Sequence, residues 1–265
     1  MSRNDREGRA GGAAKPKRAG REEVKKDAAG VRLQVYLARC GVGSRRHCDE
    51  LIAEGRVSVN GATISRMGTK VQARDGVTVD GRPVKPSTGK IYIALHKPRG
   101  YLCANSDPDK RPLASQLFSS VIPTRLFHVG RLDFLSSGLI LYTNDGEFSK
   151  IVTHPSSGIE KEYLVEAARP IEQQMLTQYE KGIQVGEERY RCKSCTLKGS
   201  RAALITLTAG KNREIRTVFT SRNIRLKRVH RVRIGPVHLK GIAPGHFRKL
   251  TEREVRWFLA HGSGN

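Results

Sequence analysis

The most informative stretch of this sequence is His128-Val-Gly-Arg-Leu-Asp-Phe-Leu-Ser-Ser-Gly-Leu-Ile-Leu-Tyr-Thr-Asn-Asp-Gly146. It places one carboxylate, that of Asp133, in a turn-prone segment between Gly130 and Gly138, just before the apolar run 139–142. An apolar run closed by an Asn-Asp-Gly turn signal predicts a buried strand. A loop that leads into a buried strand holds a side chain rigidly. We therefore interpret Asp133 as a candidate reactive acid.

The composition indicates which kind of partner the chain binds. Its 265 residues include 49 Lys and Arg against 25 Asp and Glu, a formal net charge of +24. Such a basic excess favours a phosphate backbone as the partner. The sequence shows no apolar stretch near the ~20 residues that span a bilayer and no signal peptide at its N-terminus. Five cysteines without a framework spacing favour a reducing compartment, so we expect a cytoplasmic protein that binds no membrane.

Composition also divides the chain into regions. Residues 1–30 hold nine basic and five acidic side chains with almost no large apolar residue, so we expect a disordered basic arm. Residues 31–88 have the pattern of a small domain. The stretch Lys85-Pro-Ser-Thr-Gly-Lys90 is typical of a linker, and we expect a second, larger domain over residues 89–265.

The small domain is predicted to contain two helices followed by a β-ribbon. Apolar residues recur at helical spacing over 33–38, and Ser44 is placed to cap a second helix that ends at Gly55. The segments 56–61 and 77–82 are short strand candidates that end in Asn-Gly and Asp-Gly turns.

Residues 31–84 resemble the S4 RNA-binding domain. The resemblance rests on Arg32-Leu-Gln-Val-Tyr-Leu37, Gly43-Ser-Arg-Arg46 and Gly55-Arg-Val-Ser-Val-Asn-Gly61. It agrees with the charge pattern, because two of the arginines lie in the first turn of a helix whose amides already favour anions. A solvated basic helix packed on a hairpin is the alternative. The RNA-binding residues predicted in this domain are Arg32, Arg45, Arg46 and Arg56.

The second domain has a mixed pattern that predicts an α+β fold. Its strand candidates are 91–96, 139–143, 161–167, 203–207 and 232–239. Its helix candidates are 146–152, 171–179 and 212–219. These strands are not spaced for a regular βαβ array, so we expect a mixed, mostly antiparallel sheet flanked by a few helices.

Three segments of this domain form a constellation. They are Gly130-Arg-Leu-Asp133, Lys161-Glu-Tyr163 and Gly210-Lys-Asn-Arg-Glu-Ile-Arg216. Each alone has an ordinary explanation: a lone Asp in a turn is usually a cap or solvated, and a strand Tyr is usually part of the core. Cations at a helix start are unusual because the helix dipole disfavours them, which indicates a functional use. In one basic chain the three segments together indicate a site that acts on RNA.

Residues 91–250 resemble the pseudouridine synthases of the Rsu type, which act on ribosomal RNA and join an S4 domain to a catalytic domain in this order. The resemblance rests on the three segments of the constellation together with Ser137-Gly138-Leu139, Thr143-Asn-Asp-Gly146 and the opening Lys97-Pro98-Arg99-Gly100. Two departures concern Glu214, where members usually have Gln, and Thr217-Val218, where they have Arg-Met. They put phosphate contacts or substrate choice in question.

The resemblance implies roles for individual residues. Asp133 is the expected catalytic aspartate, Tyr163 lines the base pocket, and Arg216 pairs with the aspartate, as we expect in a bidentate manner. Leu132 and Ile215 are expected to line the base pocket as well. The remaining predicted RNA-binding residues are Lys97, Arg99, Arg131, Lys211, Asn212 and Arg213.

The expected reaction is the isomerisation of one uridine to pseudouridine in ribosomal RNA, free or in a pre-ribosomal particle, by Asp133 acting on a flipped-out uridine. Large-subunit RNA is slightly favoured over small-subunit RNA. The reaction needs no redox step or group donor, so we expect no cofactor and no metal. The alternative is a non-catalytic S4-type ribosome-assembly factor. Without a heptad pattern, we expect a monomer.

A basic segment and a cysteine pair are two further features of the sequence. Six cations without an acid among them occur within twelve residues, and we interpret them as a surface that follows phosphates, with a solvated helix face as the alternative. They are Arg222, Arg225, Lys227, Arg228, Arg231 and Arg233. The pair Cys192 and Cys195 is interpreted as strand or loop thiols in preference to a metal site, because no second close cysteine pair accompanies it.

Overall fold

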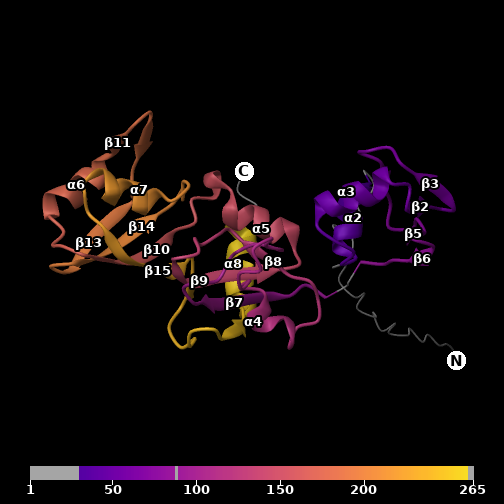
Figure 1. Cartoon of the computed structure of the whole chain (residues 1–265). Helices are drawn as coiled ribbons and strands as arrows, with labels where there is room; N and C mark the ends of the chain where they lie inside the picture. Colours follow the sequence, from indigo (N-terminus) through magenta and orange to yellow (C-terminus); the bar gives the residue numbers. More distant parts are fainter. Residues whose placement is uncertain (1–29, 87–88, 262–265) are drawn as a thin grey trace, which may run out of the picture. The chain divides into compact units, whose positions relative to one another are not determined.

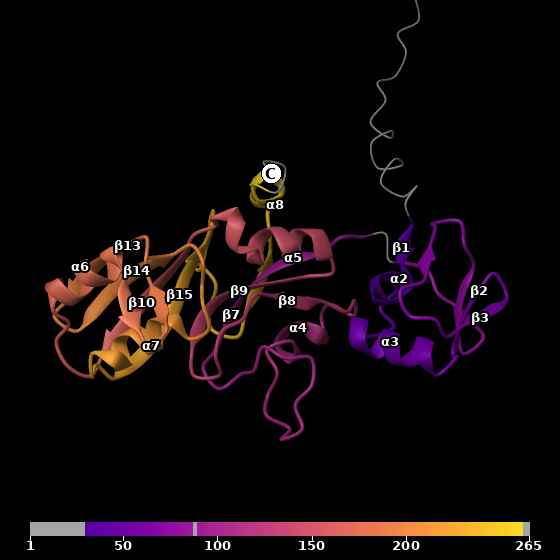
Figure 2. The same cartoon turned by 90° about the horizontal axis from the view of Figure 1, so that it is seen from above.

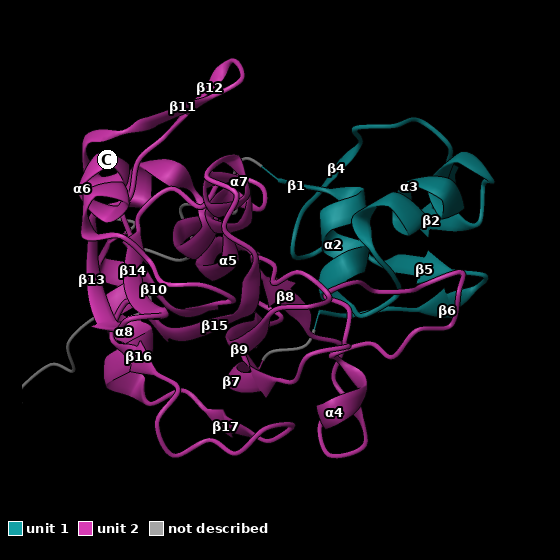
Figure 3. Ribbon diagram, turned by 60° about the vertical axis from the view of Figure 1, so that its left-hand side comes forward, with its two compact units in different colours: residues 1–87 teal, residues 88–265 magenta. Residues whose placement is uncertain are grey.

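The structure is a computed structural model that describes residues 30–86 and 89–261. The basic arm expected over residues 1–30 therefore lies, except for its last residue, outside the described residues. The chain divides into two compact units, Met1–Ser87 and Thr88–Asn265 (Figure 3). No helix within the described ranges is long and apolar enough to cross a membrane.

Over residues 30–86, the first unit contains two helices, two paired short strands and a four-stranded antiparallel sheet in the order β3-β2-β5-β6. Its helices are α2 (Leu33–Arg39) and α3 (Arg45–Ala53). The paired strands are β1 (Val31–Arg32) and β4 (Lys70–Val71). The sheet strands are β2 (Val57–Val59), β3 (Ala62–Ile64), β5 (Val77–Val79) and β6 (Arg82–Pro83). This is the predicted S4-like pattern, with each of the two turn signals forming a hairpin of its own.

Local sequence explains these elements. The Ser44 side chain accepts a hydrogen bond from the His47 amide at 3.1 Å, which confirms the predicted helix cap. Asn60 and Asp80 have φ of 52° and 49°, and each is followed by a glycine that also has positive φ. Two successive left-handed residues make the tight turn that matches the twist of paired strands.

The second unit is built on a nine-stranded sheet in the order β13-β14-β10-β15-β9-β7-β17, to which β16 and β8 add at β15 and β9. The strands are β7 (Tyr92–Lys97), β8 (Phe127–Val129), β9 (Ser137–Thr143), β10 (Lys161–Ala167), β13 (Ser194–Gly199), β14 (Ala202–Leu207), β15 (Leu226–Ile234), β16 (Val237–His238) and β17 (Phe247–Lys249). All of the pairings are antiparallel except that of β15 with β9. The expected α+β class and mostly antiparallel sheet are confirmed.

Helices pack on this sheet at two places (Figures 1 and 2). The helices α6 (Gln173–Lys181) and α7 (Glu214–Ser221) lie beside β10 and β14. The helices α5 (Gly146–Thr153) and α8 (Glu252–His261) lie beside β7 and β9. The helices of the unit are α4 (Gln116–Ser119), α5 (Gly146–Thr153), α6 (Gln173–Lys181), α7 (Glu214–Ser221) and α8 (Glu252–His261), and a separate hairpin is formed by β11 (Ile183–Val185) and β12 (Glu188–Tyr190).

The strand β9 is buried on both faces, which explains its uninterrupted apolar run. Ile140 and Tyr142 belong to the core that contains α6 and α7, whereas Leu139 and Leu141 belong to the core that contains α5 and α8. Side chains alternate between the two faces of a strand, so a strand covered on both faces needs apolar residues at every position.

One strand prediction was wrong. The segment 232–239 was expected to be one strand, but it contains the end of β15, which runs from Leu226 to Ile234, and the short strand β16, which folds back and pairs with β15. Two positive charges of β15 face acids on the neighbouring strand β10: Arg228 lies opposite Glu166, and Arg233 lies opposite Glu162. Opposite charges on paired strands attract one another, so a charged sequence is compatible with a strand in the middle of this sheet.

The parallel pairing of β9 with β15 depends on Gly138. Gly138 lies opposite Arg231 with φ of +109°, and a Cβ at this position would lie 2.2 Å from the Arg231 carbonyl oxygen. The neighbouring pair is joined by a hydrogen bond of 2.8 Å between Ser137 Oγ and His230 Nδ1. Only glycine allows the two backbones to approach this closely at the point where β9 begins.

We therefore expect Gly138→Ala to lower the free energy of unfolding by about 2 kcal/mol or more, because it adds both a backbone clash and a strained dihedral. The matched control is Gly146→Ala in α5, where a Cβ would meet nothing within 4 Å. Urea denaturation of both variants measures the difference. Equal stability of the two variants would show that the close approach is not required.

Candidate active site

A cleft of about 100 Å³ in the second unit is lined by all three segments of the predicted constellation. Its other walls come from Leu207 at the end of β14 and from Val229 of β15. The lining residues are Arg131, Leu132, Asp133, Ser136, Tyr163, Leu207, Gly210, Lys211, Arg213, Glu214, Ile215, Arg216 and Val229. The structure thus brings together Asp133, Tyr163 and Arg216 with the two expected base-pocket residues, Leu132 and Ile215.

The turn that carries Asp133 is fixed from two sides. The Ser136 amide donates to the Asp133 carbonyl at 3.0 Å, which closes the turn. The Gly100 amide donates to the Phe134 carbonyl at 2.8 Å, so the segment after β7 holds the turn from outside. The strand β9 starts immediately after the turn. Asp133 therefore lies on a short loop fixed to the central strand, and its side chain remains 40% exposed toward the cleft.

Arg216 approaches Asp133 from the first turn of α7. Its Nε lies 3.5 Å from Asp133 Oδ2, and its Nη2 donates to Ser136 Oγ at 3.1 Å and to the Leu135 carbonyl at 3.3 Å. The expected bidentate pairing is therefore corrected: one nitrogen faces the carboxylate, and another holds the turn. Burial lowers the pKa of the Arg216 guanidinium, and the neighbouring carboxylate opposes this shift.

Tyr163 lies on β10 and is 8% exposed. Its hydroxyl accepts a hydrogen bond of 3.3 Å from Nη1 of Arg231, whose Cζ lies 5.8 Å from the ring centre. The register of β10 against β15 shifts between Glu162 and Tyr163, and such irregularities re-aim side chains. Because Arg231 donates to the hydroxyl oxygen, the phenolic proton is free to be donated elsewhere.

Arg231 is the main residue of this site that the sequence did not reveal. It was expected on a phosphate-binding surface, but it is only 2% exposed, and its Nε donates to the Leu139 carbonyl at 2.6 Å. Its Nη2 is buried without a hydrogen-bond partner in the described part of the chain. The signal that could have revealed it is its position two residues after Val229, on the same face of an alternating strand.

Lys97 was predicted to bind RNA, and the structure corrects this. The side chain is fully buried, and Nζ donates to the carbonyls of Pro98 and Tyr101 at 3.0 and 2.9 Å. Burial lowers the pKa of Lys97 to about 8. Lys97 therefore closes the loop after β7 and places a positive charge inside the unit.

Lys161, the basic residue of the Lys-Glu-Tyr element, is in a similar environment. Its Nζ donates to the Ile159 carbonyl at 3.1 Å, and burial together with the charge of Arg231 lowers its pKa to about 8. The interior near Tyr163 thus contains Lys97, Lys161 and Arg231. Each of these cations is hydrogen-bonded to uncharged oxygens, so their positive charge is not neutralised by those contacts.

The entrance to α7 differs from the prediction. The helix begins at Glu214 and not at Asn212, and Arg213 precedes it in a left-handed conformation with φ of 50°. Glu214 is 4% exposed and accepts hydrogen bonds from the Lys211 amide at 3.0 Å and the Tyr179 hydroxyl at 3.1 Å. Burial raises the pKa of the Glu214 carboxyl. Glu214, which stands where family members usually have Gln, thus has a structural role: it joins the loop at Lys211 to Tyr179 of α6.

The other predicted RNA-binding residues of this unit lie at the surface. Arg131 and Arg213 are exposed and line the cleft, whereas Arg99 and Asn212 are exposed outside the lining. Lys211 lines the cleft, but its ammonium forms an ion pair with Glu188 of β12.

In the first unit, Arg32, Arg45 and Arg46 are exposed, the last two in the first turn of α3. Arg56 is exposed but bound to Asp80 through two hydrogen bonds of 2.6 and 2.8 Å. This pair links β2 to the turn between β5 and β6. RNA binding by Arg56 stays a prediction, and it competes with the ion pair.

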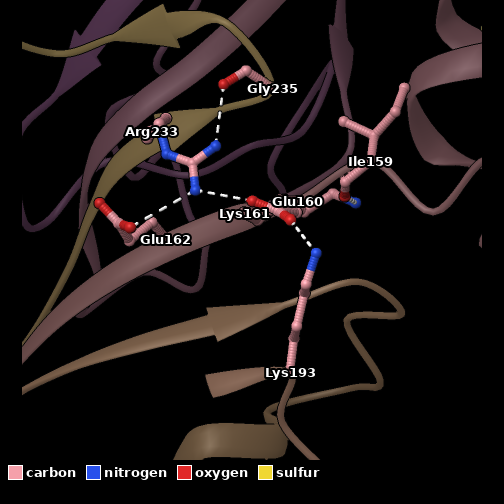
Figure 4. A network of polar contacts seen from close by, with 7 residues as sticks. All are labelled: Ile159, Glu160, Lys161, Glu162, Lys193, Arg233 and Gly235. Carbon is pink, nitrogen blue, oxygen red and sulfur yellow. Dashed lines mark hydrogen bonds and ion pairs between the residues drawn. The ribbon is translucent and has the colours of Figure 1, made fainter. Parts of the chain in front are cut away.

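The basic segment 222–233 does not form the expected continuous surface. Arg231 is buried, Arg228 lies 3.1 Å from Glu166, and Arg233 contacts Glu160 and Glu162 at 2.8 and 3.4 Å. Figure 4 shows that Glu160 also forms an ion pair with Lys193, so this network joins β15 to the segment before β13. The three cations of the segment that remain exposed outside such ion pairs are Arg222, Arg225 and Lys227.

No group of three or more His, Cys, Asp or Glu side chains that could hold a metal occurs within residues 30–86 and 89–261. Cys192 and Cys195 are both buried, with their sulfur atoms 3.5 Å apart. Cys195 belongs to β13, and its thiol donates to the Leu176 carbonyl at 3.2 Å. The pair packs between the sheet and α6, which agrees with the interpretation of strand or loop thiols.

Known families match both units. The family described as RNA pseudouridylate synthase matches residues 91–221, and the S4 domain matches residues 31–77. An RNA pseudouridine synthase of Borreliella burgdorferi is 42% identical over 82% of this chain and 88% of its own length. The chain belongs to the RNA pseudouridine synthase family, in the Rsu branch that carries an S4 domain.

Two further relatives agree with this membership. The ribosomal large subunit pseudouridine synthase B of Bacillus subtilis is 36% identical over 85% of this chain and 94% of its own length. A crystal structure of a pseudouridylate synthase matches with a TM-score of 0.64 and 25% identity, over 86% of this chain and 99% of that one. The match extends through both units, so the order of S4 domain and catalytic domain is shared.

The buried charge of Lys97 predicts a pH dependence of stability. Its pKa is about 8 in the folded protein and near 10.5 in an unfolded chain, so the unfolded state binds more protons between these values. Stability contributed by this group therefore rises with pH across that interval. We expect the wild type to gain stability relative to Lys97→Met as the pH rises above 8.

Urea denaturation of both proteins at several pH values checks this expectation. Lys227→Met, which removes an exposed cation, controls for the loss of one charge. A constant stability difference between the wild type and Lys97→Met across the interval would contradict the assigned burial.

Proposed function

We propose that this enzyme isomerises a specific uridine of ribosomal RNA to pseudouridine, with large-subunit RNA as the substrate. The observation that carries the proposal is the 3.5 Å approach of Arg216 to Asp133 at the wall of a cleft shared with Tyr163. The Bacillus subtilis relative, named for the large ribosomal subunit, supports the choice of RNA. A cytoplasmic location and a monomeric state stay predictions.

Asp133 is the proposed catalytic residue. Pseudouridine forms when the bond between N1 and C1′ breaks and the base reattaches through C5. Asp133 acts by attack at C1′, by attack at C6, or by removal of a sugar proton, and each route needs a charged carboxylate in a partly dry cleft. Arg216 lies 3.5 Å from the carboxylate and helps to hold it in place. The residues present supply this chemistry without a group donor.

The uridine must leave the RNA stack to reach this carboxylate. We propose that its base lies against the Tyr163 ring, between Leu132 and Ile215, which line the same cleft. Base stacking on an aromatic ring is favourable for any base, so Tyr163 alone selects no sequence. Selection of the uridine then comes from contacts to neighbouring nucleotides.

The Tyr163 hydroxyl has a proposed role beyond stacking. Arg231 donates to the hydroxyl oxygen at 3.3 Å, which directs the phenolic proton away from Arg231. A proton aimed into the cleft is available to a uracil oxygen when negative charge develops on the detached base. Arg231 is thus a positioning residue that acts through Tyr163.

The first test is to incubate the full chain with unmodified large- and small-subunit ribosomal RNA transcripts. New pseudouridines are then mapped by carbodiimide-dependent reverse-transcriptase stops. We expect a defined stop in large-subunit RNA with the wild type. Asp133→Asn should lower the single-turnover rate by roughly 10⁴-fold or more while RNA affinity stays near that of the wild type. RNA binding without any new stop would favour the assembly factor, and wild-type turnover by Asp133→Asn would exclude the proposed role.

The second test couples Tyr163 to Arg231. We expect Tyr163→Phe and Arg231→Met each to slow single turnover, and the double variant to be no slower than the worse single variant. The expected coupling energy is about 0.5–3 kcal/mol. Unfolding of each variant is measured in parallel, because a purely structural loss at Arg231 would persist in the Tyr163→Phe background. Additive losses of rate would contradict the positioning role.

A further inference from the structure

A second cleft of about 390 Å³ adjoins the candidate active site. Arg213 and Arg216 line both clefts, so the two meet at the start of α7. The second cleft continues along α7 and the turn that leads into β15. Its lining residues are Arg213, Arg216, Thr220, Asn223, Ile224, Arg225 and Leu226.

The lining has the chemistry of a nucleotide site. Three arginines and no carboxylate line it, which favours an anion. Thr220 and Asn223 add uncharged hydrogen-bonding groups, and Ile224 and Leu226 add apolar surface. The volume lies within the range of ~300–1,000 Å³ that small-molecule sites occupy. A phosphate with an attached base needs this combination of cations, polar groups and apolar wall.

The guanidinium groups of Arg213 and Arg225 are accessible to an anion. Both side chains are exposed, and neither forms an ion pair with a carboxylate in the portion of the chain that the structure describes. This contrasts with Arg228 and Arg233, which pair with Glu166 and Glu162 of β10. Arg213 is also held in a left-handed conformation, with φ of 50°, at the boundary between the two clefts. Strained backbone of this kind occurs where a side chain must be aimed for function.

We propose that the second cleft binds the RNA nucleotide next to the target uridine, with its phosphodiester held by Arg213 and Arg225 and its base against Ile224 and Leu226. The inference rests on the proposed function, since it assumes that a uridine occupies the cleft of Asp133. It adds the path of the RNA strand: away from the target, the strand follows the exposed side of α7 toward β15.

The two clefts together explain why an open site can select one uridine. A nucleotide seated beside Arg213 fixes the phosphate adjacent to the flipped sugar. This in turn fixes the sugar relative to Asp133. Phosphate contacts position a nucleic acid without reading its sequence, whereas the apolar wall at Ile224 and Leu226 distinguishes bases by size.

The test uses the full chain and a fluorescein-labelled decamer of adenosines with a single central uridine. In a series of decamers, each phosphodiester near the uridine is replaced in turn by an uncharged methylphosphonate. Fluorescence anisotropy gives the dissociation constant for the wild type and for Arg225→Ala, Arg225→Lys and Arg222→Ala. Arg222 is the matched control, because it is an exposed arginine in the same turn that does not line the cleft.

We expect Arg225→Ala to weaken binding about tenfold and to reduce the salt slope by about 0.7, the value for one lost phosphate contact on a single strand. Arg225→Lys should keep most of the affinity, and Arg222→Ala should bind nearly as the wild type does. One methylphosphonate next to the uridine should weaken the wild type to a similar extent and should not further weaken Arg225→Ala.

Three results would overturn the inference: equal weakening by Arg225→Ala and Arg222→Ala, full methylphosphonate effects in Arg225→Ala, or failure of the wild type to bind the decamer. Pseudouridine mapping in ribosomal RNA separates the two proposals. If the wild type modifies RNA but the losses of affinity caused by Arg225→Ala and by the methylphosphonate are additive, only the proposed role of the second cleft is refuted. If the effects coincide but no pseudouridine forms, the proposed function fails while the nucleotide site remains.

Discussion

The candidate site depends on the parallel contact between β9 and β15. Gly138 lies against the Arg231 backbone at a distance that excludes any Cβ, and this contact joins the half of the sheet that carries Asp133 to the half that carries Tyr163. The turn of Asp133 ends where β9 begins, and Tyr163 lies on the strand next to β15. A single close approach between two backbones therefore sets the separation of the acid from the aromatic ring, and α7 adds Arg216 to the same cleft.

Positive charge in this protein has two separate uses. At the surface it favours RNA as a partner, and the formal net charge of +24 predicts salt-dependent binding. Inside the second unit, Lys97 and Arg231 are buried and Lys161 is half-buried, and each is hydrogen-bonded to uncharged oxygens. Burial of these groups is costly, as the lowered pKa values of both lysines indicate. That cost is understandable if the interior field stabilises the negative charge that develops on a detached base.

Sequence reasoning succeeded where the signal was local. The bounds of β10, the cap at Ser44 and the convergence of Asp133, Tyr163 and Arg216 followed from periodicity, capping and a family resemblance. It failed where the outcome depended on partners far along the chain. Arg233 of β15 resembled a surface cation because the acids that it pairs with lie about seventy residues earlier, at Glu160 just before β10 and at Glu162 on β10. The carbonyls that Lys97 binds lie one and four residues away, but its burial comes from the place of β7 between β9 and β17, which the local sequence does not show.

The most direct test of the account is a crystal structure of Asp133→Asn bound to an RNA that contains the mapped target uridine. The account predicts that the uridine is turned out of its stack, with its ring on Tyr163 and its C1′ or C6 about 3.5 Å from the side chain of residue 133. A target uridine that stays stacked in the RNA, or that binds away from the cleft between β9, β10 and α7, would contradict the central claim.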